Sequence, residues 1–125
     1  MYSRITYEQP NRDLIKHEIK LFVIGFIDIE IVARLFPHYT EISHFNLLDE
    51  WMTQTDLVLR KDSTLYYYNI ENIVEGSKEA LAKLEDYAET KCNQLVSAYC
   101  RIIDKINEQI EKENNPNKIY RRKTD

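Results

Sequence analysis

The chain of 125 residues contains few residues that interrupt regular backbone structure, with only two glycines and three prolines. Average usage would give about nine glycines and six prolines in a chain of this length. Tight β-hairpins, phosphate-binding loops and parallel-sheet crossovers depend on glycine for backbone conformations with positive φ. The shortage therefore favours helices that are joined by short polar turns.

Cysteine and long apolar runs are also scarce. The only two thiols, Cys92 and Cys100, would lie roughly 12 Å apart in one continuous helix, which is too far for a disulfide. The most apolar stretch, residues 21–32, contains Asp28 and Glu30, whereas a membrane-spanning helix needs about twenty apolar residues. We therefore expect a cytoplasmic protein with reduced thiols and with no membrane segment or signal peptide.

The residues that are present make an ordinary globular composition. The chain is 43% hydrophobic, which is above the range in which chains stay disordered, and its length suits one domain. The formal net charge of −4 argues against binding of nucleic acid over the whole surface. Residues 114–125 form a basic tail, which is the candidate for a weak nucleic-acid contact. Its cations are Lys118, Arg121, Arg122 and Lys123.

The strongest pattern predicts one long amphipathic helix from about Ser77 to about Glu113. At 1.5 Å per residue, such a helix of about 37 residues spans roughly 55 Å, which exceeds the diameter expected of a compact domain of this size. We therefore expect part of its apolar stripe to need cover from outside the neighbouring helices. The stripe recurs every three or four residues and consists of Leu81, Leu84, Ala88, Cys92, Leu95, Tyr99, Ile102 or Ile103, Ile106 and Ile110.

Shorter helices are expected before the long one. Residues 1–10 are interpreted as an N-terminal arm, and residues 11–113 as one helical domain. Asn11 is a candidate N-cap of the first helix, and Asp28 is a candidate N-cap of a second, short helix. Pro37 should end that second helix, because the residue before a proline is disfavoured in the helical region.

A third helix is expected to run to about Arg60, with Ser43 or Thr40 as its N-cap and Trp51 beside its apolar face. Residues prone to form strands flank the turn that follows, so a small β-hairpin near residues 57–68 is an alternative there. Together these elements predict an all-α fold, in the form of an antiparallel helical bundle of four to five helices whose spine is the C-terminal helix.

Two motifs contain residue types that could carry chemistry. His38-x2-Glu41-x2-His44 contains ligand types that zinc accepts, but the spacing matches no zinc pattern, so we expect neither a metal site nor a cofactor. Arg12-x4-His17 resembles the Arg-x4–6-His element of the HEPN ribonucleases, although the element usually lies on a later helix in those families. The resemblance implies helical-bundle ribonucleases in which the arginine steadies a phosphate and the histidine is a general acid or base. One alternative is therefore a HEPN-like ribonuclease or nucleotide-binding protein that uses Arg12 and His17.

The leading hypothesis is a non-enzymatic protein-interaction module that self-associates, as a homodimer, through the uncovered part of the long helix and a tyrosine cluster. Tyrosine is typical of protein interfaces. The low glycine content and the abundance of Asn, Ile, Lys and Tyr are typical of small bacterial, phage or mobile-element accessory proteins. The predicted interface residues are Trp51, Tyr66, Tyr67, Tyr68, Tyr99, Ile103, Ile106 and Ile110.

Overall fold

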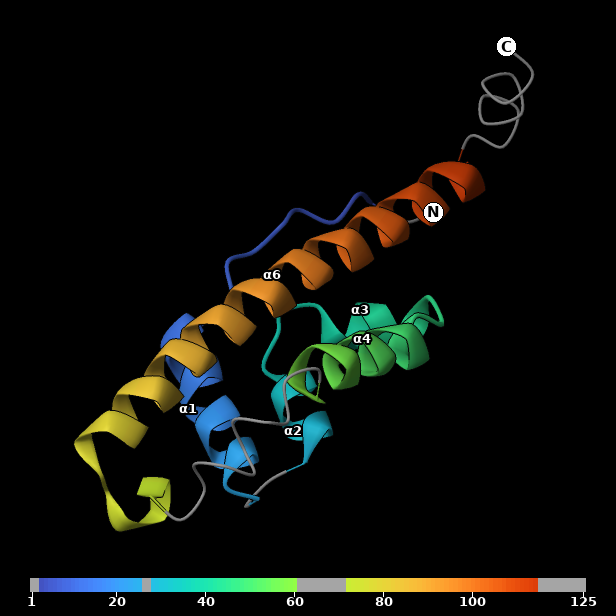
Figure 1. Ribbon diagram of the computed structural model, residues 1–125. Helices are drawn as coiled ribbons and strands as arrows, with labels where there is room; N and C mark the ends of the chain where they lie inside the picture. The colour runs from blue at the N-terminus through green and yellow to red at the C-terminus, as the bar shows by residue number, and fades with distance from the viewer. Residues whose placement is uncertain (1–2, 26–27, 61–71, 115–125) are drawn as a thin grey trace.

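The computed structural model describes residues 3–25, 28–60 and 72–114, and within these ranges all regular structure is helical (Figure 1). This confirms the predicted all-α class. With a short helical segment at 72–75, the described residues contain six helical segments, whereas four to five were expected. The other five are α1 (Arg12–Val23), α2 (Ile29–Arg34), α3 (Tyr39–His44), α4 (Leu48–Arg60) and α6 (Lys78–Asn114).

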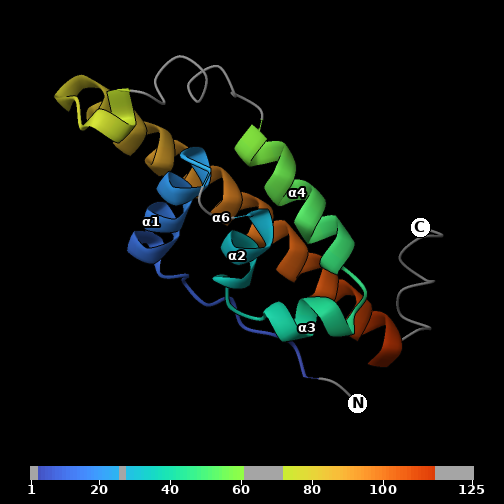
Figure 2. The ribbon, with the colours of Figure 1, turned by 90° about the horizontal axis from the view of Figure 1, so that it is seen from below.

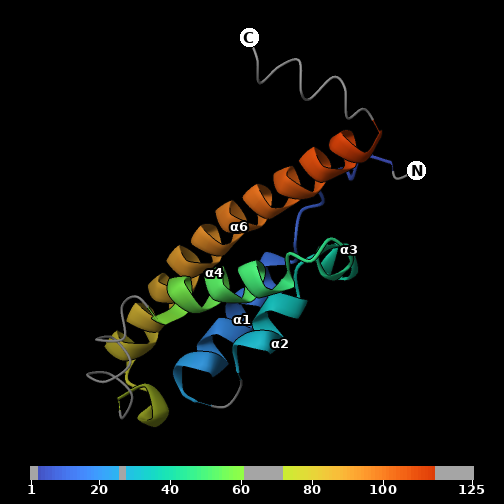
Figure 3. The ribbon, with the colours of Figure 1, turned by 90° about the vertical axis from the view of Figure 1, so that its right-hand side faces the viewer.

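Helix α6 is the longest element, and its predicted extent is confirmed, because it covers 37 residues from Lys78 to Asn114. At its start, the Ser77 hydroxyl accepts a hydrogen bond from the backbone N–H of Ala80 at 3.5 Å. Figures 1 and 3 show the helices α1 to α4 on one side of α6. In Figure 2, α1 and α4 lie on either side of α2, with α6 behind them. None of the described helices is long and apolar enough to cross a membrane.

Helix α1 runs antiparallel to α6. Lys16 near the middle of α1 forms an ion pair with Glu89 at 2.9 Å. Lys20, one turn later in α1, forms an ion pair with Glu85, one turn earlier in α6. Because the order of the partners is reversed between the two helices, the chain directions of α1 and α6 are opposed.

Helix α4 is also antiparallel to α6, on its other flank. Glu50 at the start of α4 forms an ion pair with Lys105, and the backbone carbonyl of Leu59 near its end accepts a hydrogen bond from the Tyr87 hydroxyl at 2.6 Å. Between these two contacts the Trp51 side chain is completely buried. The helices α1 and α4 therefore pack along two flanks of the same side of α6.

The aromatic side chains of the core connect the segment after α2 to α4 and α6. Phe36, which follows α2, packs edge-on against Trp51 with ring centroids 4.9 Å apart, and it lies 5.3 Å from the Tyr99 ring. The indole N–H of Trp51 donates a hydrogen bond to the backbone carbonyl of Ala33 at 3.1 Å. A buried indole that keeps its hydrogen bond gains from apolar burial without the cost of an unpaired donor.

Both of the first two N-caps are confirmed. The Asn11 side chain accepts a hydrogen bond from the backbone N–H of Leu14, and the Asp28 side chain accepts one from the backbone N–H of Ile31. Pro37 lies just beyond the end of α2 at Arg34, as expected.

The predicted third helix is divided in the structure, which accounts for the additional helix. The first part is α3, which has His38 as its N-cap rather than Ser43 or Thr40 and ends at His44. Asn46 then adopts a left-handed backbone conformation with φ of 60°, and α4 begins after this turn. The turn allows both Phe45 and Leu47 to be buried, which a continuous helix would not allow, because residues two positions apart point in different directions.

The alternative hairpin is wrong at its first strand, because residues 57–60 belong to helix α4. Its second half lies outside the described residues. The division of the chain into arm, domain and tail stays a prediction.

Candidate interaction site at the N-terminal arm

The N-terminal arm, residues 3–10, is extended and runs beside the C-terminal half of α6 (Figures 1 and 2). Asn107 of α6 fixes it through a two-point contact. Its side-chain oxygen accepts a hydrogen bond from the backbone N–H of Ile5 at 2.7 Å, and its side-chain nitrogen donates one to the backbone carbonyl of Ile5 at 3.0 Å. Asn107 is only 7% exposed. Because its side-chain amide both donates to and accepts from the backbone of Ile5, it pairs with the arm much as a neighbouring β-strand would.

His38 makes a second contact with the backbone of the arm. Its Nε2 lies 3.1 Å from the carbonyl oxygen of Thr6, and because that oxygen can only accept, the ring nitrogen is the donor. The ring also lies between two carboxylates, with Glu8 at 3.7 Å and Glu41 at 3.6 Å. The backbone of His38 is left-handed, with φ of 65°, which is uncommon outside glycine. This strained conformation therefore positions a side chain that holds the arm.

An aromatic contact completes the attachment of the arm. The Tyr7 ring packs against Tyr99 of α6 with ring centroids 5.5 Å apart. Burial, followed by a hydrogen bond to Cys100, raises the pKa of Tyr7. Ile5 and Tyr7 are half-buried, whereas Arg4, Thr6 and Glu8 are exposed. This alternation with a period of two is that of an extended chain with one face against the protein.

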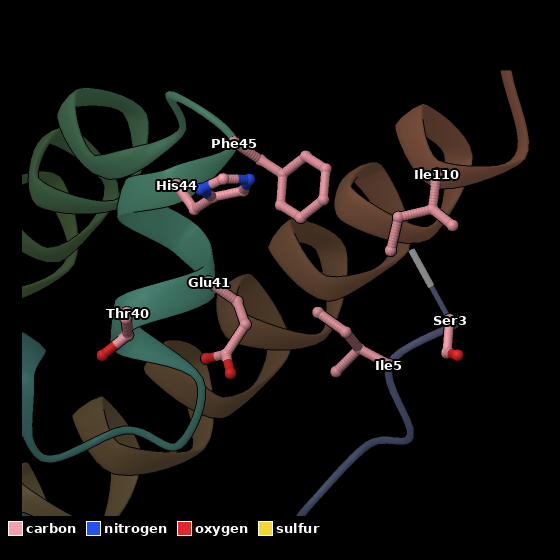
Figure 4. Close-up of a pocket in the computed structure, with 7 residues that line it drawn as sticks. All are labelled: Ser3, Ile5, Thr40, Glu41, His44, Phe45 and Ile110. Carbon is pink, nitrogen blue, oxygen red and sulfur yellow. The ribbon is translucent and has the colours of Figure 1, made fainter. Parts of the chain in front are cut away.

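A pocket of about 350 Å³ opens where the arm, α3 and the end of α6 meet (Figure 4). Ile5, Phe45 and Ile110 provide its apolar walls from three different parts of the chain. Figure 4 shows these three side chains directed toward a common space. Polar groups surround them, so the pocket combines an apolar interior with a polar margin. Those polar residues are Ser3, Thr40, Glu41 and His44.

The structure does not bring Arg12 and His17 together. The Arg12 guanidinium contacts α6, where it donates hydrogen bonds to the Asn93 side chain at 2.5 Å and to the Cys92 thiol at 3.8 Å. His17 is exposed, and five residues of α-helix place the two side chains about 140° apart around α1. Within one copy of the chain, these residues do not face a common substrate position.

Five of the predicted interface residues are buried within the chain itself, namely Trp51, Tyr99, Ile103, Ile106 and Ile110. The other residues of the predicted apolar stripe of α6 are buried as well, except for Leu81, which is 44% exposed. The arm and α3 cover the C-terminal part of the stripe, which sequence reasoning had not counted as cover. With the arm in place, the chain itself covers these five side chains, and Ile110 among them also lines the pocket.

The remaining predicted site residues lie outside the described residues. They are Tyr66, Tyr67 and Tyr68, together with the tail residues Lys118, Arg121, Arg122 and Lys123.

Sequence reasoning missed Asn107 and His38 as the residues that hold the arm. Asn107 lies in a helix where its polar side chain suggests solvent, and nothing local shows that a segment 102 positions earlier in the chain covers it. A weak signal was present in the arm, because Ile5 and Tyr7 alternate with polar residues in the manner of a strand with one buried face.

Across the three described ranges, no group of three or more histidine, cysteine, aspartate or glutamate side chains could hold a metal ion. The chain matches no family model, and comparison with curated proteins and with solved structures gave no significant match.

Proposed function

We propose that this chain is a non-enzymatic protein-interaction module that self-associates as a homodimer, with the pocket between the arm, α3 and α6 as its contact site. The observation that carries the proposal is the open apolar pocket itself. Binding sites in proteins are typically concave and largely apolar, with a few polar groups at the margin. The walls formed by Ile5, Phe45 and Ile110, with Glu41 and His44 beside them, have this character.

A second copy of the chain is the proposed partner because the surface also carries exposed aliphatic side chains. Leu57 is 58% exposed and Val74 is 69% exposed, so a side chain of this kind is available for insertion into the pocket of another copy. In a two-fold symmetric dimer, each copy would give one side chain and receive one. A cytoplasmic accessory protein of bacterial, phage or mobile-element origin is the setting that we propose.

We also interpret α1, α4 and α6 as an antiparallel helical bundle with α6 as its spine. The reversed order of the contacts along α1–α6 and α4–α6 supports this interpretation. In such a bundle the pocket lies at one end, next to the arm, where a partner can approach it.

Blocking the pocket tests the proposal. Thr40 lines the pocket and is exposed, whereas Ser43 is exposed on the same helix and does not line it. We expect the wild-type chain to be dimeric at micromolar concentration in sedimentation equilibrium. Thr40→Trp should shift it to monomer, while the matched Ser43→Trp should leave the dimer unchanged. A monomeric wild type would refute self-association, and a dimeric Thr40→Trp variant would show that the contact lies elsewhere.

The ribonuclease alternative draws no support from the geometry, because Arg12 is engaged with Asn93 on α6. An RNA-cleavage assay addresses it directly. We expect wild-type chain and His17→Ala to show the same absence of cleavage, and activity that depends on His17 would restore the alternative.

A further inference from the structure

The surface beneath the N-terminal arm has the features of a site that recognises an extended peptide. We define this arm-binding surface by Asn107, His38 and Tyr99, which contact the arm. Asn107 and His38 together pair with three main-chain polar atoms of Ile5 and Thr6. Such contacts depend on the extended shape of the bound segment and are independent of its sequence.

Side chains of the arm supply the selectivity. Ile5 and Tyr7 face the protein, with Ile5 on the pocket wall and Tyr7 against the Tyr99 ring. Thr6 between them is exposed. The surface therefore selects a branched aliphatic residue, followed by any residue and then an aromatic one. Proteins that bind a peptide as an added β-strand recognise it in the same way, because main-chain hydrogen bonds provide affinity and alternate side chains provide specificity.

The arm is attached to the rest of the chain in the manner of a tethered ligand. The hydrogen bonds of Ile5 and Thr6 go to residues 102 and 32 positions away, and the arm continues directly into the helical body at the Asn11 cap of α1. Release of the arm would leave the ion pairs and helix contacts of α1, α4 and α6 in place. The binding of the arm to the helical body thus resembles an association between two molecules that are joined by a linker.

We infer that the arm-binding surface is a docking site for an extended segment of a protein partner with the pattern branched aliphatic, any residue, aromatic, and that the arm is its resident occupant. The partner segment replaces the arm and makes the same contacts with Asn107 and His38. This inference goes beyond the proposed function, because it concerns the surface beneath the arm, which shares Ile5 with the pocket but is defined by the contacts of Asn107, His38 and Tyr99.

Peptide binding to the full-length chain tests the inference. The probe is a fluorescein-labelled peptide with the sequence of residues 2–10, followed by fluorescence anisotropy. In the wild type the tethered arm competes at an effective concentration on the order of millimolar, so binding should be weak. In Ile5→Ser, whose own arm is weakened, the affinity should rise at least tenfold. A peptide with serine at both the Ile5 and the Tyr7 positions should not bind.

A matched pair of second substitutions locates the site. Added to Ile5→Ser, Asn107→Asp removes the amide donor and should lower the affinity at least tenfold. Asn93→Asp is the same change on the same helix, away from the arm, and should leave the affinity unchanged. Equal affinities of the two double variants would overturn the inference, as would the absence of binding to an Ile5→Ser chain that circular dichroism shows to be folded.

Hydrogen exchange in the wild type provides a test that needs no substitution. The backbone N–H of Ile5 is protected only while it is bonded to Asn107. If the arm is replaceable, this amide should exchange through a local opening, faster than the amide of Tyr99 and with little dependence on denaturant. Exchange of the Ile5 amide only upon global unfolding would overturn the inference, because it would make the arm an integral part of the core.

Discussion

Two tyrosine hydroxyls on α6 have opposite surroundings. The Tyr87 hydroxyl donates a hydrogen bond to Leu59, whereas the Tyr99 hydroxyl is buried without a hydrogen-bond partner. A buried polar group that lacks a partner opposes folding through its lost hydration, whereas a satisfied one contributes about 1 kcal/mol.

The two tyrosines therefore make a matched prediction. Tyr87→Phe should lower the free energy of unfolding by about 1 kcal/mol, while Tyr99→Phe should leave it unchanged or raise it by up to about 1 kcal/mol. Urea denaturation followed by circular dichroism measures both values. A loss above about 1 kcal/mol for Tyr99→Phe would mean that this hydroxyl has a partner in solution.

Tyr99 also predicts a loss of stability in alkali. Burial, and after it the nearby acidic groups of Tyr7 and Glu8, raise the pKa of Tyr99 above its ordinary value. The folded state thus retains a proton that the unfolded chain releases above about pH 10. The stabilisation is fully present below that pH and is lost as the pH rises further.

The melting temperature should accordingly fall as the pH rises above about pH 10, and Tyr99→Phe should make the fall shallower. Burial also raises the pKa of Tyr7 and Cys92, so a residual slope is expected in the variant. Thermal melts of the two proteins across this range provide the comparison, and equal slopes would contradict the assignment to Tyr99.

At the scale of elements, the break between α3 and α4 rests on one residue with an unusual backbone. Asn46 has φ of 60° and is exposed, so its substitution changes backbone strain with little effect on packing. We expect Asn46→Ala to lower the free energy of unfolding by about 1 kcal/mol, whereas Asn46→Gly should cause no loss. Urea denaturation distinguishes them, and equal losses would show that the Asn46 side chain, rather than φ, matters.

The elements that were predicted from sequence are those with purely local signals. Residues 78–114 repeat apolar side chains over many turns, and Asn11 and Asp28 stand directly before apolar periodic segments, so the long helix and both caps could be predicted. The division into α3 and α4 could not, because the left-handed turn at Asn46 accompanies the burial of Phe45 and Leu47 in a core to which distant segments contribute.

The candidate site was predicted far less well than the helices. Its polar contacts join Asn107 to Ile5 and His38 to Thr6, and periodicity within one segment carries no information about pairs of segments. Only the alternation of Ile5 and Tyr7 in the arm was visible in advance. Sequence patterns show which face of an element is apolar, but they do not show which element will cover it.

At the scale of the whole molecule, the length of α6 predicts apolar surface that the neighbouring helices leave uncovered. Instead, the arm and α1 together follow α6 over most of its length, from Ile5 at Asn107 to Lys20 at Glu85. An extended segment of about eight residues spans up to roughly 28 Å, so a short arm covers as much of a helix as a longer helical segment would. The prediction from sequence counted only neighbouring helices as cover for the apolar stripe of α6 and left out an extended segment such as the arm.

The charge distribution predicts how the whole chain meets nucleic acid. With a net charge of −4 and a basic C-terminal segment, any affinity for RNA or DNA should come from residues 117–125 and should fall steeply with salt. Deletion of residues 117–125 should therefore abolish binding in a filter or anisotropy assay at 50 mM salt. Binding that survives the deletion would place the nucleic-acid contact on the helical body.

The contact between Ile5 and Asn107 has a consequence for synthesis on the ribosome. Residues that lie 102 positions apart cannot meet until Asn107 has been translated, and α1 and α4 likewise wait for α6, against which they pack. Folding that depends on such distant pairs is slow to begin, and until then the apolar faces stay open to aggregation. The order of synthesis thus leaves residues 3–10 without their binding surface on α6 while all the helices that follow them are being made.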